Sequence, residues 1–99
     1  MSEHYILEGK EVVSCDLMTW AKMMEDTSSR RVSRTEINDK VNVSTVFLGL
    51  DHSFGSGPRL FFETMIFGGE HDQYQERFET WDQAEAGHKV AVSLAEESE

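Results

Sequence analysis

Two runs of strand-forming residues, joined by a short glycine-containing loop, constrain the fold of this chain more than any other feature. The runs are VNVSTVFLGL (residues 41–50) and RLFFETMIFGG (residues 59–69), and SFGSGP (residues 53–58) lies between them. Both runs carry apolar side chains at odd and even positions, a pattern typical of strands that are covered on both faces. The sequence therefore predicts two neighbouring antiparallel strands at the centre of a sheet.

Shorter segments extend this pair into a meander. RVSRTEI (residues 31–37), followed by a turn at residues 38–40, predicts a hairpin with the first run. QERFE (residues 75–79) predicts a short, charged strand suited to a sheet edge. Nearer the N-terminus, YILEGKEVV (residues 5–13) places two β-prone runs around a glycine, which predicts a small hairpin.

A first helix is predicted over residues 16–25, with Asp16 as a suitable N-cap. One face of this helix, which we expect to lie buried on the sheet, carries Leu17, Trp20, Ala21 and Met24.

The last helix has the strongest start signal in the chain, a capping box formed by Thr80 and Gln83. Gly87 lies inside this helix, where glycine costs about 1 kcal/mol relative to alanine. We therefore expect the helix to approach the sheet closely at Gly87.

These elements indicate one α+β domain. A chain of 99 residues has the usual size of a single domain, and residues 1–99 contain no boundary or repeat. We predict an antiparallel sheet of about four strands and a small N-terminal hairpin, packed with two α-helices. Residues 96–99 (EESE) are expected to form a frayed acidic tail.

The chain is strongly acidic. Nineteen Asp and Glu residues against nine Lys and Arg residues give a formal net charge of -10. Direct nucleic-acid binding is disfavoured, because no basic face supplies the phosphate contacts that it needs. This charge has two explanations. It either keeps the protein soluble, or it binds a basic partner, for example a DNA-binding protein whose groove accepts carboxylates in place of DNA phosphates. A candidate acidic binding face carries Glu76, Glu79 and Asp82.

The sequence favours a cytoplasmic protein without a cofactor. Cys15 is the only cysteine, which excludes an internal disulfide and a Cys-x-x-Cys zinc pattern. The first residues are polar and no apolar signal-peptide core follows them. No apolar run approaches the roughly 20 residues of a membrane-spanning helix, so no membrane contact is expected.

The histidines are too dispersed for one metal centre. His52 and His71 are expected at opposite ends of the central strand pair. A strand of about nine residues, at about 3.3 Å per residue, separates them. They are too far apart to bind the same metal ion, so we expect no metal site. His88 lies two turns into the last helix, over the middle of the sheet, and Glu63 lies mid-strand. We expect a buried polar pair of Glu63 and His88, which is either structural or able to exchange protons.

The loop after the first run is a second candidate binding surface. Asp51 and His52 lie beside Phe54, an apolar residue that either contacts a partner or folds back on the core. The loop lacks the lysine and the following helix of a Walker loop, so it does not indicate a nucleotide site.

VSTVFLGLDHSFG (residues 43–55), LFFETMIFGG (residues 60–69) and ERFETWDQAEAGH (residues 76–88) resemble a family of small proteins encoded by tailed phages and prophages. The resemblance covers the chain from about residue 17 onward. It implies a phage setting inside a bacterial host, and it brings no activity, cofactor or catalytic residue with it.

Two functions remain. The first is a non-enzymatic phage accessory or counter-defence protein that binds a host or phage protein through its acidic face or its loop. The second is a small enzyme or metal-dependent factor that uses Asp51, His52, Glu63 or His88. The short chain and the dispersed histidines favour the first.

Overall fold

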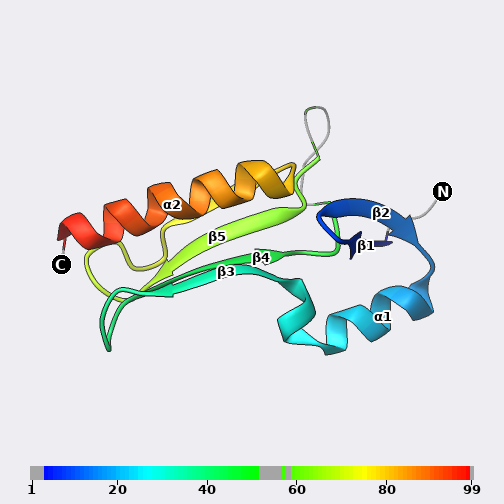
Figure 1. Cartoon of the computed structure of the whole chain (residues 1–99), viewed down its shortest axis with the longest axis horizontal. Helices are drawn as coiled ribbons and strands as arrows, with labels where there is room; N and C mark the ends of the chain where they lie inside the picture. The colour runs from blue at the N-terminus through cyan, green and yellow to red at the C-terminus, as the bar shows by residue number, and fades with distance from the viewer. Residues whose placement is uncertain (1–3, 52–56, 58, 99) are drawn as a thin grey trace.

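The computed structural model describes residues 4–51, 57 and 59–98 and has an α+β fold with two antiparallel sheets (Figure 1). A four-stranded sheet has the order β3-β4-β5-β6, and β1 and β2 form a separate hairpin. The predicted meander and N-terminal hairpin are therefore confirmed. In chain order the elements are β1 (His4–Glu8), β2 (Glu11–Cys15), α1 (Leu17–Glu25), a 3-10 helix η1 (Thr27–Arg30), β3 (Arg31–Glu36), β4 (Asn42–Phe47), β5 (Phe62–Phe67), β6 (Gln75–Phe78) and α2 (Trp81–Ser98).

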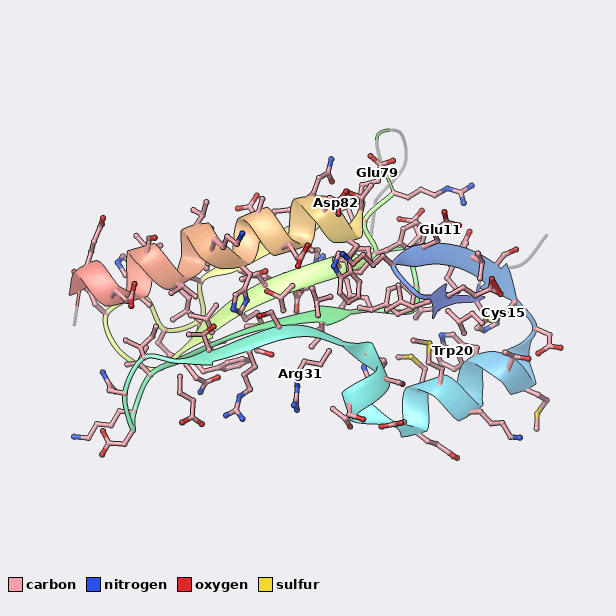
Figure 2. All side chains as sticks on the ribbon, in the orientation of Figure 1. Glu11, Cys15, Trp20, Arg31, Glu79 and Asp82 are labelled. Carbon is pink, nitrogen blue, oxygen red and sulfur yellow. The ribbon has the colours of Figure 1, made fainter. Side chains whose placement is uncertain are left out.

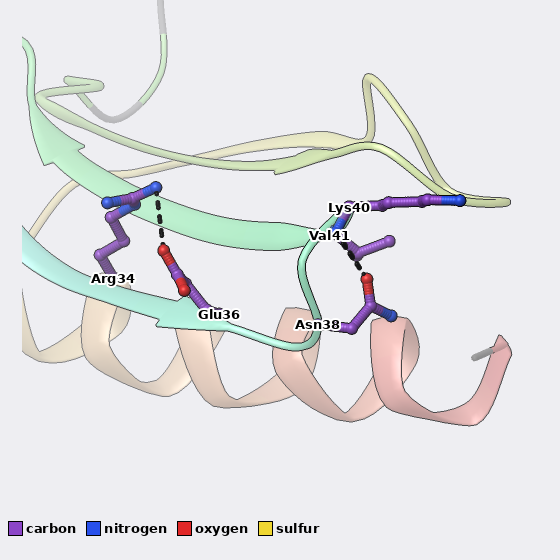
Figure 3. A network of polar contacts seen from close by, with 5 residues as sticks. All are labelled: Arg34, Glu36, Asn38, Lys40 and Val41. Carbon is purple, nitrogen blue, oxygen red and sulfur yellow. Dashed lines mark hydrogen bonds and ion pairs between the residues drawn. The ribbon is translucent and has the colours of Figure 1, made fainter.

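The turn between β3 and β4 forms where it was predicted. The side-chain oxygen Oδ1 of Asn38 accepts hydrogen bonds from the N–H groups of Lys40 (2.8 Å) and Val41 (3.0 Å) (Figure 3). Asparagine favours such turns because its side chain bonds to the backbone that follows it. This turn fixes the register of the two strands.

The end of β4 anchors the N-terminal part of the chain. β4 is shorter than the apolar run that predicted it, because the backbone turns at Gly49, whose φ of 77° lies in the left-handed region that glycine tolerates. The carbonyl oxygen of Gly49 accepts hydrogen bonds from the backbone N–H of Tyr5 and from the indole N–H of Trp20, each at 3.1 Å. The hairpin and α1 are thereby held against one end of the sheet.

Among the residues that the structure describes, a helix covers only one face of the four-stranded sheet. α2 lies along this face (Figure 1), while α1 contacts β1 and η1 instead of the opposite face. On that opposite face Val46 and Met65 are half-buried and Phe67 is 39% exposed. The prediction that the central strands are covered on both sides is therefore wrong. The covered face buries alternate residues of β4 and β5, namely Val43, Thr45, Phe47, Phe62, Thr64 and Ile66.

The first helix has its predicted limits but not its predicted burial. Asp16 caps it, since its Oδ1 accepts from the N–H of Thr19 at 2.8 Å. Trp20 faces the ring of His4, with 5.0 Å between the ring centroids, but Leu17 is 57% exposed and Met18 is 72% exposed. The expectation that Leu17 belongs to a buried face is wrong, because a two-stranded hairpin is too narrow to cover the whole apolar stripe.

The capping box of the last helix is confirmed. The side-chain oxygen of Gln83 accepts from the N–H of Thr80 at 3.3 Å, and the hydroxyl of Thr80 accepts from the N–H of Gln83 at 3.2 Å. The predicted close approach at Gly87 is confirmed as well. A β-carbon added to Gly87 would lie 2.1 Å from the ring atom Cζ of Phe78 on β6.

Gly87→Ala is expected to lower the free energy of unfolding by up to about 2 kcal/mol, although alanine is the better helix former. Overpacking against the Phe78 ring costs about 1–3 kcal/mol, which outweighs the gain of about 1 kcal/mol in helix propensity. Urea unfolding of the two proteins measures the difference. The double variant Gly87→Ala/Phe78→Leu removes part of the ring, and Gly87→Ala should cost less in that background. An equal cost in both backgrounds contradicts the packing explanation.

Candidate functional site

A pocket of about 460 Å³ lies where the N-terminal hairpin meets the beginning of α2. We call it the acid-rimmed pocket. β2 and the turn before it form one wall, the segment that leads into β5 contributes to the floor, and the start of α2 forms the other wall. Its lining residues are Lys10, Glu11, Val12, Phe61, Glu79, Thr80, Trp81 and Asp82.

The floor of the acid-rimmed pocket is aromatic. Phe61 is only 6% exposed, and its ring lies 4.6 Å from the ring of Tyr5 on β1. Trp81 is half-buried and meets the buried ring of Phe62 edge-on, at 6.3 Å and 85°. These contacts fix the two rings before any ligand arrives.

The rim carries three carboxylates from two distant parts of the sequence. Figure 2 shows Glu79 and Asp82 at the start of α2, with Glu11 on the neighbouring strand β2. All three are exposed, and none belongs to an ion pair within the described part of the chain. Lys10 is the one cationic residue among the described residues of the lining. The rim therefore presents an excess of negative charge.

The beginning of α2 is capped by the side chains of its own first residues. The side chain of Gln83 accepts from the N–H groups of both Glu79 (3.0 Å) and Thr80 (3.3 Å). These bonds satisfy donors that would otherwise bind a phosphate or carboxylate at a helix N-terminus. The carboxylates of Glu79 and Asp82 complement the positive end of the helix dipole while still facing solvent.

Trp81 supplies an unused donor. Its indole Nε1 atom is buried and has no hydrogen-bond partner among the described residues. A buried donor without a partner costs about 1–3 kcal/mol, so its retention in a pocket wall is notable.

The acidic residues predicted from the sequence separate into two groups. Glu79 and Asp82 meet at the acid-rimmed pocket, but Glu76 lies on β6 opposite Thr64 and does not line it. Glu11 was missed, because nothing local in the sequence indicates that β2 docks beside α2. The two β-prone runs in YILEGKEVV predict the hairpin, but they do not indicate where the hairpin docks on the rest of the protein.

The loop residues have different outcomes. Asp51 has a structural role, since its carboxylate accepts from the N–H of Leu60 at 3.0 Å and lies 4.0 Å from Nε of Arg59. It thereby ties the two ends of the loop together. His52 and Phe54 lie outside the described residues.

The predicted pair of Glu63 and His88 is wrong. Glu63 points to the face of the sheet that α2 leaves uncovered, where its carboxylate bonds to Nε of Arg77 at 3.0 Å. Its neighbours Phe62 and Thr64 point toward α2 instead. Because successive residues of a strand face opposite sides, Glu63 cannot share the helix side with them.

His88 is held by threonines. It is 5% exposed, and its Nε2 lies 2.9 Å from the hydroxyl of Thr35 while its Nδ1 lies 2.8 Å from the hydroxyl of Thr45. Thr45 bonds in turn to the hydroxyl of Thr64. Burial lowers the pKa of His88 below its ordinary value. This chain of polar groups separates two apolar clusters of the core, one around Val43 and the other around Phe47 and Phe62.

A metal centre finds no support in the part of the chain that the structure covers. No group of three His, Cys, Asp or Glu side chains there is arranged to hold a metal ion. Among the same residues, no helix is both long and apolar enough to cross a membrane. Comparison with protein-family models, curated proteins and solved structures gives no match to this chain.

Proposed function

We propose that this chain is a non-enzymatic protein-binding module, encoded by a phage, that docks on a host or phage protein through the acid-rimmed pocket. The observation that carries the proposal is the combination of three unpaired carboxylates with an aromatic floor in one cavity. The phage setting and the bacterial cytoplasm are proposed on the resemblance of the sequence.

The pocket chemistry fits a basic side chain of the partner. An arginine or lysine bonds strongly to carboxylates and is attracted by the faces of aromatic rings. Arginine is also among the residues that dominate binding energy when they fill a pocket at an interface. The net charge of -10 adds a long-range attraction to a basic partner, and direct binding to nucleic acid is not proposed.

The enzymatic alternative is weaker. Glu63 and His88 cannot act together, because Glu63 lies on the face of the sheet opposite to the one that His88 contacts. Asp51 is occupied in closing its loop. The three exposed carboxylates of the acid-rimmed pocket have no histidine beside them among the described lining residues.

Charge reversal at the rim is expected to weaken partner binding at least about tenfold, because each lost charge-assisted hydrogen bond is worth about 1.5–3 kcal/mol. The test variant is Glu11→Lys/Glu79→Lys/Asp82→Lys. The full chain is immobilised, host proteins are captured from lysate and identified by mass spectrometry, and the affinity for each captured protein is then measured with purified components.

The matched control is Glu25→Lys/Glu96→Lys/Glu97→Lys, which changes the net charge equally at exposed sites outside the pocket. We expect the control to keep the partner and the rim variant to lose it. If both variants lose it equally, only the net charge matters and the pocket proposal fails. If neither loses it, the partner binds another surface.

A further inference from the structure

The outer side of β3 is an open edge of the four-stranded sheet. β3 is the first strand in the order β3-β4-β5-β6, so no described strand pairs with its far side. The pairing of β3 with β4 shifts register between Arg31 and Ser33, so the regular part of this edge is the four residues from Ser33 to Glu36. An edge strand presents unpaired N–H and C=O groups on which another strand can add.

The hydrogen bonds of the β3–β4 hairpin identify which backbone groups face outward. The N–H of Ile37 donates to the carbonyl of Val41 at 2.9 Å, toward β4. Because backbone groups of successive residues in an antiparallel strand turn to opposite sides, those of Ser33 and Thr35 also face β4. The N–H and C=O groups of Arg34 and Glu36 therefore point away from the sheet.

The side chains of these two residues leave that edge accessible. Arg34 lies opposite Ser44 and Glu36 lies opposite Asn42, on the face of the sheet that α2 does not cover. They form an ion pair of 3.5 Å with each other (Figure 3) and are 45% and 68% exposed. Such an exposed pair contributes little stability, so both groups are free to exchange partners.

We propose that β3 pairs antiparallel with β3 of a second copy of this chain. The two copies are related by a two-fold axis at Thr35, so that Thr35 of one copy lies opposite Thr35 of the other. Arg34 of each copy then lies opposite Glu36 of the other. An arginine and a glutamate two residues apart on one face are self-complementary in this arrangement, and opposite charges across strands are favourable. The contact is isologous, as a closed dimer requires.

The charges also exclude the neighbouring registers. Outward-facing residues must meet outward-facing residues, so the pairing can shift only in steps of two. A shift that centres the axis on Arg34 places two arginines opposite each other, and a shift that centres it on Glu36 places two glutamates together. Like charges in these positions are destabilising. β3 also carries Arg31, so two acidic chains approach through a relatively basic strand.

A cavity between β3 and α2 leaves room for side chains of the added strand. It measures about 460 Å³ and lies between β3 and α2, where Ser33, Thr35, Lys89 and Val92 are among its lining residues. A strand added outside β3 sets alternate side chains on this same face of the sheet. The proposal does not depend on the acid-rimmed pocket, which lies at the junction with the N-terminal hairpin.

Sedimentation velocity of the full chain, over a concentration series near 0.15 M salt, is expected to show a monomer–dimer equilibrium. Arg34→Glu alone and Glu36→Arg alone should each weaken dimerisation at least about tenfold, since each sets like charges opposite each other twice. An equimolar mixture of these two variants should form a heterodimer, because Glu at position 34 of one chain then meets Arg at position 36 of the other. Lys22→Glu on α1 is the charge-matched control for Arg34→Glu and should dimerise normally.

A second variant tests the backbone pairing. Arg34→Pro removes an N–H that faces outward, and proline is tolerated at such edge positions, so circular dichroism should show a folded chain that no longer dimerises. A monomer at every concentration overturns the proposal, and so does a mixture that associates no better than its separate components. A dimer that survives Arg34→Pro uses another surface, which also overturns it. Binding of an extended peptide by a monomeric chain would assign the edge to a different partner.

Discussion

Gly68→Ala is expected to lower the free energy of unfolding by about 3–4 kcal/mol. Gly68 ends β5 with a φ of 86°, a left-handed conformation that costs an L-residue about 1–2 kcal/mol. A β-carbon at this position would lie 2.0 Å from the carbonyl oxygen of Lys40. The clash is with backbone in the β3–β4 turn, so it cannot be relieved by rotating a side chain.

Thermal unfolding measures this effect, and a loss of this size corresponds to a fall in Tm of about 15 °C or more for a domain of this length. Gly9→Ala is the matched control. Gly9 has a φ of 63°, but a β-carbon there meets nothing within 4 Å. We expect Gly9→Ala to cost only about 1–2 kcal/mol. Equal losses in the two variants would contradict the collision with Lys40.

The order of the strands and the helix caps could be predicted because both are local. Alternation, turn residues and a capping box act within a few positions, and Asn38, Thr80 and Gln83 form the bonds that their spacing indicated. Gly87 was also informative, since a glycine inside a helix is costly without a packing reason. These signals sufficed for the α+β fold.

The facing of side chains on β5 could not be predicted. Apolar residues occupy both odd and even positions of this strand, so the sequence does not indicate whether the odd or the even positions face α2. Glu63 was assigned to the helix side, where its neighbours Phe62 and Thr64 lie instead. The partners of His88 were hidden for a related reason, because Thr35 and Thr45 read as ordinary strand residues.

The sequence could predict one side of the acid-rimmed pocket, at the start of α2, but not the side formed by the N-terminal hairpin. Glu79 and Asp82 are close in sequence and precede a recognisable helix, so their shared position was foreseeable. Glu11 joins them because the carbonyl of Gly49 and the ring of Phe61 hold the N-terminal hairpin against the sheet. Contacts of such long sequence separation leave no pattern in a single sequence.

His88→Ala is expected to lower the free energy of unfolding at neutral pH by about 2–4 kcal/mol. The substitution leaves a cavity between the two apolar clusters and takes away one of the two hydrogen-bond partners of the buried Thr45 hydroxyl. Neutral imidazole suits this position, because one ring nitrogen donates, the other accepts, and a hydroxyl can do either. Chemical unfolding at neutral pH measures the loss.

His88 should also make the stability depend on pH. Burial lowers its pKa in the folded protein below the ordinary value of about 6.5, so the unfolded chain takes up the proton first as the pH falls. Stability is therefore complete above about pH 6.5 and declines as the pH drops toward the folded pKa, by at most about 1.4 kcal/mol per pH unit. The carboxyl groups of Asp16 and Asp26, whose pKa values are lowered by their capping bonds, act only at more acidic pH.

Urea unfolding between pH 7.5 and pH 5 tests this dependence with two variants. His88→Gln keeps a polar side chain but removes the titrating group, so its free energy of unfolding should be lower at neutral pH and nearly flat down to pH 5. His71→Gln changes a histidine in the turn between β5 and β6, leaves the buried imidazole of His88 in place, and serves as the control. If His88→Gln keeps the slope, another group titrates in this range, and the buried imidazole is not the cause of the acid sensitivity.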